Sequence, residues 1–194
     1  MINETMNKAF NDQINAELYS AYLYLSMNAY FEEQSLTGFA NWMKIQVQEE
    51  MAHAMGMYDY LNSRDGHIIL EQIDKPVCTW NSALEVFEAV LKHEEHVTSL
   101  INKLADVAEE QKDRASMQFL NWYIKEQVEE EATAKTIVDK LKWPEMIQMH
   151  CSCSTQNSAQ EHTTLRLLNK KIIIIKSPHF MRAFFIAALA RCRF

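Results

Sequence analysis

Glu50 and His53 are the residues whose types and spacing most directly suggest chemistry. They lie in a predicted helix over residues 37–61, on a face with polar residues at its centre and apolar residues toward both ends: Phe39, Met43, Gln46, Glu50, His53, Met57 and Tyr60. A lone buried carboxylate is unfavourable, so Glu50 needs a partner. The Glu-x-x-His spacing suggests a metal ion held between facing helices. For this motif alone, the commoner alternative is a surface glutamate beside a hydrogen-bonded core histidine.

Three other segments show the same interrupted stripe. Helices are predicted over about residues 3–31, 37–62, 82–111 and 114–142, and the polar interruptions outside the second are Glu17, Glu94, and Gln127 with Glu130. Residues 34–38 and Asp113 form short turns, whereas residues 63–81 are long, contain Pro76 and lack a period. The sequence therefore predicts an all-α fold, a ferritin-like antiparallel four-helix bundle with one long crossover between helices two and three.

Composition and charge narrow the classes of function. Three Gly and three Pro supply little turn chemistry for an all-β fold, and 48% hydrophobic residues are ample for a core. The net charge of −7 is uneven, because residues 143–194 carry +5 and residues 1–142 carry −12. An acidic body argues against nucleic acid as a partner and favours cations.

Cysteine usage and hydropathy point to the cytoplasm. The four cysteines form no zinc-ligand pattern, which suits a reducing compartment. The first residues lack a signal pattern, and no apolar run reaches the roughly 18 residues that span a bilayer. We therefore expect a cytoplasmic protein with no membrane partner.

Six polar residues interrupt the stripes near the middle of their helices. They are Glu17, Glu50, His53, Glu94, Gln127 and Glu130. Together they would bring ligands from four helices to one level. Four carboxylates and one imidazole suit a pair of divalent iron ions.

At these residues the sequence resembles the bacterial non-haem ferritins. The resemblance covers residues 1–142, and its motifs are residues 15–20 (NAELYS), 48–53 (QEEMAH), 92–94 (KHE) and 121–131 (NWYIKEQVEEE). It implies a ferroxidase that oxidises Fe(II) with dioxygen or hydrogen peroxide and stores ferric mineral inside a cage of twenty-four subunits.

The resemblance also implies roles for individual residues. Glu17, Glu50 and His53 would hold the first iron, and Glu50, Glu94 and Glu130 the second, with Gln127 close by. A third iron site would use Glu49, Glu126, Glu129 and Glu130. Tyr24 and Trp122 would lie near the centre and supply electrons to dioxygen.

The fourth helix departs from the symmetric di-iron pattern. Where a second Glu-x-x-His would stand, it offers Gln127 and Glu130. With one imidazole missing, we expect the second iron to be held more loosely, so that iron passes through the site as substrate. Ala52 occupies the position expected for a haem-ligating methionine, so no haem is predicted. His93 and His96 are expected at the surface.

Residues 143–194 do not resemble the family, which continues with a Gly-containing turn and a fifth helix. Read one base earlier, the codons permit a ferritin-like ending (LAGDDSNALFMLDAEL), and several of its residues are forced by Trp143, Pro144, Met146 and Met149. We infer an out-of-frame tail caused by a single-base deletion near codon 143, in the gene or in its recorded sequence. The alternative is a genuine extension that replaces the fifth helix.

Two other classes of function also use buried polar residues in a helical bundle. Another di-iron carboxylate enzyme, such as a rubrerythrin-like peroxidase or a manganese catalase, would usually show a second Glu-x-x-His or an added cysteine pair. A non-catalytic helical bundle would tolerate apolar replacement of Glu17, Glu50 and Glu94 with gained stability.

Overall fold

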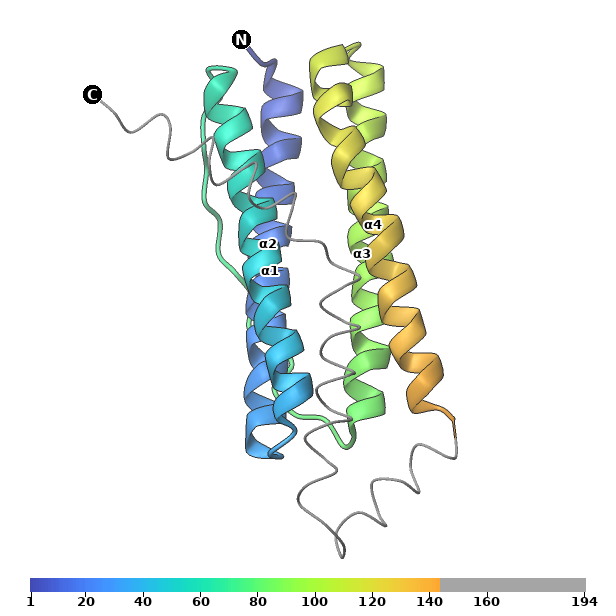
Figure 1. The fold of residues 1–194 in the computed structure, drawn as a ribbon. Coiled ribbons are helices and arrows are strands. Elements are labelled where there is room, and N and C mark those ends of the chain that lie inside the picture. The colour runs from blue at the N-terminus through green and yellow to red at the C-terminus, as the bar shows by residue number, and fades with distance from the viewer. Residues whose placement is uncertain (144–194) are drawn as a thin grey trace, which may run out of the picture. The chain divides into compact units, whose positions relative to one another are not determined.

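Four long helices make up the part of the chain that the structure describes, residues 1–143 of a computed structural model. They are α1 (Glu4–Glu33), α2 (Thr37–Ser63), α3 (Ala83–Glu110) and α4 (Arg114–Leu141), as Figure 1 shows. The predicted all-α bundle with a long connection between α2 and α3 is confirmed, and the predicted helix ends agree to within about two residues. The tail from residue 144 onward lies outside the described residues.

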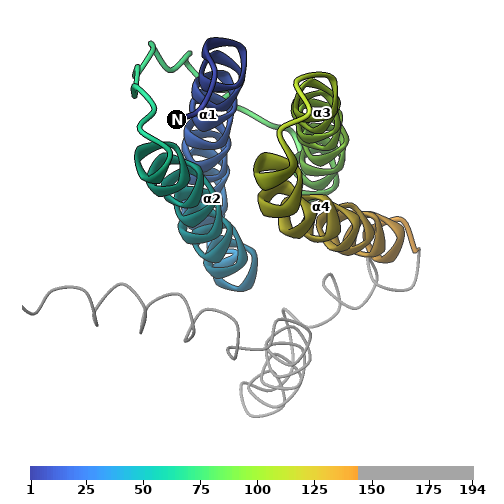
Figure 2. The same ribbon diagram turned by 90° about the horizontal axis from the view of Figure 1, so that it is seen from above.

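The helices form two antiparallel hairpins, α1 with α2 and α3 with α4. Figure 2, viewed from above, shows the pairs side by side, and close packing between the pairs runs mainly through α1 and α3. Each hairpin turn is short, because only three residues separate α1 from α2 and three separate α3 from α4. The bundle centre is therefore lined by all four helices, as the polar interruptions require.

Local chemistry explains where three of the four helices begin. Asn3, Ser82 and Asp113 precede α1, α3 and α4, and their side chains accept hydrogen bonds from the backbone amides of Met6, Glu85 and Ser116. Such N-caps satisfy amides that have no partner inside the helix, and each stabilises by about 1 kcal/mol.

The chain leaves α2 through Asp65 and Gly66, and the left-handed residue is the aspartate rather than the glycine. Asp65 adopts the left-handed conformation (φ 54°), whereas Gly66 has a negative φ. Gly66 instead permits close approach, because a Cβ there would lie 2.6 Å from Leu61 Cδ1 and 2.8 Å from Asn7 Oδ1. Ser35 and Lys112 make the corresponding left-handed turns after α1 and α3.

Two apolar clusters fill the bundle above and below its middle. One contains Phe10, Met57 and Leu120, and the other contains Met27, Phe31 and Phe87. Among the buried residues of α1, the first cluster ends at Ile14 and the second begins at Leu23, which leaves a buried polar layer between them. Each large buried side chain stabilises the fold by roughly 1.5–3 kcal/mol, so the clusters can support a polar layer that is itself unfavourable.

The α2–α3 connection, residues 64–82, is fastened to α1. The Asn7 and Asn11 side-chain amides donate to the carbonyl oxygen of His67, and their oxygens accept from the amides of His67 and Ile69 at 2.7 and 2.8 Å. This fixes the extended crossover without regular secondary structure. Among the described helices, none is sufficiently long and apolar to cross a bilayer.

Candidate metal centre

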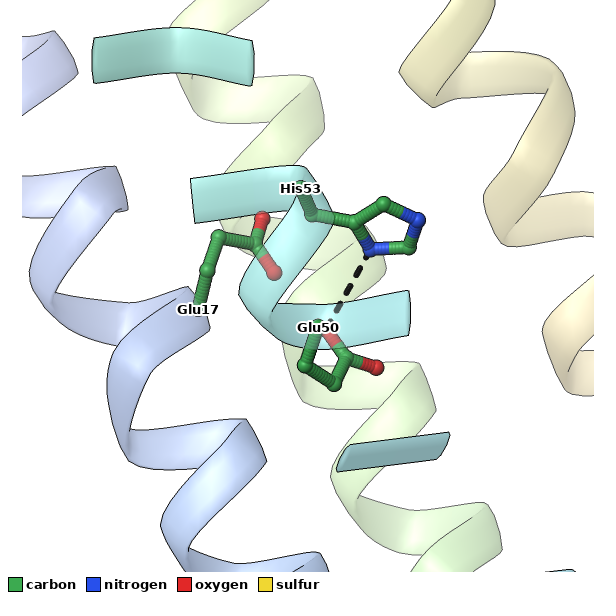
Figure 3. A group of neighbouring side chains, drawn as sticks. All are labelled: Glu17, Glu50 and His53. Carbon is green, nitrogen blue, oxygen red and sulfur yellow. Dashed lines mark hydrogen bonds and ion pairs between the residues drawn. The ribbon is translucent and has the colours of Figure 1, made fainter. Parts of the chain in front are cut away.

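Glu17 of α1 and Glu50 and His53 of α2 converge in the polar layer (Figure 3). Each offers one ligand atom, and these atoms all lie within 4.8 Å of one another. The three residues are 1%, 2% and 6% exposed, so the group is deeply buried. Among residues 1–143 this is the one group of three His, Cys, Asp or Glu side chains with such spacing.

Packing from α4 fixes the position of His53. The Tyr123 hydroxyl donates to the His53 backbone carbonyl at 3.0 Å, and the rings of Tyr123 and Trp122 lie 5.9 and 5.4 Å from the imidazole, centroid to centroid. Gly56, one turn after His53, makes this contact possible, because a Cβ there would lie 2.6 Å from the Tyr123 hydroxyl oxygen. The imidazole is therefore held from two helices, with Nδ1 3.3 Å from Glu50 Oε2.

The buried carboxyl groups are electrostatically unfavourable as a set of charges. Burial, followed by the charge of Glu50, raises the pKa of Glu17 to about 8. Burial and the charge of Glu94 raise the pKa of Glu50 well above its ordinary value. Burial and the charge of Glu130 raise the pKa of Glu94 to about 7. A bound cation would remove this repulsion and favour the ionised carboxylates.

The residues present fit a divalent metal ion. Glu17 Oε2 is buried without a hydrogen-bond partner among the described residues, although such acceptors are rarely left unpaired. Its residue, Glu17, belongs to the group formed with Glu50 and His53. Carboxylate oxygens with one imidazole nitrogen form a donor set that suits iron.

The buried layer also contains Glu94 of α3 and Glu130 and Gln127 of α4. Their side chains are engaged in hydrogen bonds. Tyr24 donates its hydroxyl hydrogen to Glu94 Oε1, and Gln127 Nε2 lies 3.3 Å from Glu94 Oε2. Gln46 Nε2 donates to Glu130 Oε2 at 3.2 Å. These carboxylates are 1% and 3% exposed, and Gln127 is 5% exposed. All six predicted residues are thus buried at one level, but only the first three converge.

The remaining predicted site residues surround this layer. Glu49 and Glu126 are half-buried and Glu129 is exposed, so they lie outside the centre formed by the buried carboxylates. Tyr24 is fully buried, whereas Trp122 is 38% exposed while its ring packs near His53.

The prediction that His93 lies at the surface was wrong, whereas His96 is exposed as expected. His93 is half-buried, its Nε2 lies 2.8 Å from Ser20 Oγ, and its ring lies 6.2 Å from that of Tyr24. Burial, and then the charge of His96, lowers the pKa of His93 to about 4. The error arises because the contact of α3 with α1 covers a flank that the helix period alone leaves exposed.

Two buried glutamines that contact ligand carboxylates received no role from the sequence. Gln13 Nε2 donates to Glu17 Oε1 at 2.9 Å, and Gln46 contacts Glu130 as described. A signal did exist, because each glutamine precedes an inward glutamate by four residues and so shares its helix face.

Comparisons with known proteins agree with this geometry. The Ferritin family, described as a ferritin-like domain, matches residues 7–143. A bacterial non-heme ferritin of Bacteroides fragilis (strain 638R) is 51% identical over 142 residues, which cover 73% of this chain and 89% of that protein.

Solved structures give the same result. The open pore ferritin of the hyperthermophilic archaeon Archaeoglobus fulgidus is 51% identical with a TM-score of 0.72, covering 73% of this chain and 88% of that one. A crystal of a PmFTN variant soaked in iron is 33% identical with a TM-score of 0.69, covering 71% and 88%. With the four-helix fold and the buried glutamate–histidine group, these similarities show that this chain belongs to the ferritin family.

Proposed function

We propose that this ferritin is an iron-storage ferroxidase, which oxidises Fe(II) to Fe(III) at a two-iron centre inside the subunit and stores the product within an oligomeric cage. The observation that carries the proposal is the buried convergence of Glu17, Glu50 and His53, with Glu17 Oε2 lacking a hydrogen-bond partner within residues 1–143. The similarity to bacterial non-heme ferritins supports it.

The two irons are substrates that the four helices hold close together. Glu17, Glu50 and His53 hold the first, and Glu50, Glu94 and Glu130 hold the second, so that Glu50 bridges them. Each Fe(II) gives up one electron, and the pair reduces dioxygen to hydrogen peroxide, or hydrogen peroxide to water, with two protons taken up. The chain's part is to bring both ions within reach of one oxidant and to neutralise their charge with carboxylates.

Residues around the centre have secondary roles in this proposal. Gln127 lies beside the second iron as a hydrogen-bond donor to Glu94. Glu49, Glu126, Glu129 and Glu130 form a third iron site next to the centre, on α2 and α4. Tyr24, which contacts Glu94, and Trp122, which packs near His53, supply further electrons to the oxidant.

The assembly is a cage of twenty-four copies in the cytoplasm, without resident haem. Family membership supports an oligomeric cage, and the number of subunits is part of the proposal. Size-exclusion chromatography with light scattering tests it, because a 24-mer has twenty-four times the 22.7 kDa chain mass. A stable monomer or dimer at micromolar concentration would contradict the cage.

The tail is proposed to be out of frame. The family match ends at residue 143, where the sequence pattern also changes. Sequencing the coding DNA around codon 143, together with an intact mass of the cellular protein, tests this proposal. A mass that matches the 194-residue chain would show that the cell makes this tail and would exclude an error in the recorded sequence.

Activity measurements with Glu50→Gln test the centre. The substitution removes the bridging charge while keeping the side chain's size, so we expect the rate of Fe(III) formation to fall by at least about 100-fold. Glu95→Gln, at an exposed position on α3, is the matched control and should keep the full rate. Equal rates in the two variants would refute the proposed centre.

Iron turnover separates ferritin from another di-iron enzyme. If iron is substrate, the protein oxidises many equivalents of Fe(II) per subunit and retains the product. Retention of two irons with no further uptake would favour a di-iron enzyme with a permanent cofactor.

A further inference from the structure

Two buried glutamine amides lie against the carboxylates of the proposed centre. Gln13 is 4% exposed and Gln46 is 1% exposed, which is unusual for glutamine. Gln13 donates to Glu17 at 2.9 Å and Gln46 donates to Glu130 at 3.2 Å. Burying an amide is unfavourable unless it is hydrogen-bonded. The pairing of these amides with two carboxylates therefore needs an explanation.

We propose that Gln13 and Gln46 are positioning residues, each of which orients one ligand carboxylate: Gln13 acts through Glu17 on the first iron and Gln46 acts through Glu130 on the second. This inference rests on the two-iron centre proposed above and extends it to residues that would not touch iron themselves.

The geometry around Glu17 shows how Gln13 would act. Gln13 lies one turn before Glu17 on the same face of α1 and occupies Oε1, whereas Oε2 has no hydrogen-bond partner among residues 1–143. The amide thereby selects one carboxylate orientation and leaves Oε2 free of hydrogen bonds from residues 1–143, in a side chain that belongs to the group formed with Glu50 and His53. Without it, the carboxylate could rotate, and the ion would lose a fixed ligand.

Gln46 connects the two hairpins. It belongs to α2, and its partner Glu130 belongs to α4, 84 residues later. α2 and α4 are not among the closely packed helix pairs, so a direct bond between their side chains fixes a distance that backbone packing leaves loose. Gln46 would therefore set how far Glu130 lies from the α2 ligands.

The amide group is well suited to this task. A glutamine donates hydrogen bonds but carries no charge, so it orients a carboxylate without neutralising it. A lysine at the same position would compete with iron for the carboxylate. An apolar residue would leave the carboxylate without its donor.

Metal titration of the assembled full-length protein tests the two roles separately. The probe is Co(II) added under nitrogen, read by its visible absorption, because cobalt takes the same oxygen and nitrogen ligands and is not oxidised. Outer ligands that orient inner ones typically change metal affinity 10–100-fold when removed. We therefore expect Gln13→Met to weaken the first binding step at least about tenfold and the second by less than about threefold. Gln46→Met should show the reverse.

The separation between steps is the decisive readout. A general loss of stability would weaken both steps alike, whereas a positioning role affects one step for each residue. Gln48→Met, at an exposed position on α2, is the matched control and should change neither step. If a methionine variant does not fold, Gln13→Asn and Gln46→Asn keep the amide but shorten its reach, and the same results are expected.

Failure of this inference can be distinguished from failure of the proposed function. If the unsubstituted protein binds two Co(II) per subunit and both methionine variants match it, the positioning roles are wrong and the centre stands. Equal weakening of both steps in both variants would also overturn the positioning roles. If the unsubstituted protein binds no Co(II), both proposals are wrong.

Discussion

The two hairpins contribute to the same buried layer in different ways. From α1 and α2, the ligand atoms of Glu17, Glu50 and His53 already lie within 4.8 Å of one another. From α3 and α4, Glu94 and Glu130 are equally buried but are engaged by Tyr24, Gln127 and Gln46. The first hairpin therefore offers a nearly formed site, whereas in the proposed centre the second would have to exchange hydrogen bonds for a metal.

This difference has a simple chemical origin. Only α2 supplies an imidazole, which can be neutral and therefore adds a ligand without adding repulsion. The second hairpin supplies carboxylates and an amide, and buried carboxylates repel each other unless donors or cations offset their charge. In the proposed centre, tighter binding of the first iron and weaker binding of the second would allow iron to pass through as substrate.

The largest effect should come from removing the imidazole. His53→Ala deletes the one nitrogen ligand of the first hairpin, and we expect the first Co(II) affinity to fall by more than about 100-fold. Gln127→Ala, at the corresponding layer of the second hairpin, removes only a hydrogen-bond donor and should weaken the second step about tenfold. Anaerobic Co(II) titration of both variants measures these affinities. Equal losses would contradict the proposed difference between the two hairpins.

Gly56 tests the contact between the hairpins next to His53. Gly56→Ala would place a Cβ 2.6 Å from the Tyr123 hydroxyl, and overpacking of this kind destabilises by about 1–3 kcal/mol. Gly38→Ala is the matched control on the same helix, because no atom of the described residues crowds that position. It should stabilise by about 0.4–1 kcal/mol through the helix propensity of alanine. Urea unfolding of both variants should give shifts of opposite sign.

Adding an imidazole to α4 should make the two sides more alike. Thr133 follows Glu130 by three residues, so Thr133→His creates a second Glu-x-x-His. We expect second-site Co(II) affinity to rise about tenfold and iron retention after oxidation to increase. A variant that binds the second ion no better would show that α4 holds residue 133 away from the centre.

The smallest effect concerns the ion pair that joins the hairpins at one end of the bundle. Arg64 Nη2 of the α2 end lies 3.1 Å from Asp113 Oδ2, the cap of α4. Partial burial opposes ionisation of Asp113, but the hydrogen bonds from Arg64 and Ser116 prevail and lower its pKa. Asp113→Asn keeps a capping oxygen and loses the charge, so we expect destabilisation of about 1 kcal/mol or less at neutral pH.

The stabilisation that Asp113 provides depends on pH, in a direction set by its lowered pKa. Because the folded pKa lies below the unfolded value of about 3.9, the stabilisation by Asp113 is fully present above that value. It is lost as the pH falls through the folded pKa. Unfolding free energies of the two proteins should therefore converge below about pH 4. A constant difference down to pH 3 would show that the pair contributes no pH-dependent stabilisation.

The sequence by itself determined the helices and the depth of the polar layer. Apolar stripes with a 3.6-residue period fix which face of each helix is buried, and a glutamate on such a stripe cannot avoid the core. Glu17, Glu50, His53, Glu94, Gln127 and Glu130 were therefore identifiable one helix at a time.

Only the tertiary structure decided which of these residues meet. Convergence of Glu17 with Glu50 and His53, the bond from Gln46 to Glu130 and the burial of His93 all depend on how one helix faces another. The helical period shows which face of a helix is buried, but not which residues of the other helices that face contacts. The packing of side chains between α1, α2, α3 and α4 makes that choice, because few arrangements fill the interior without voids.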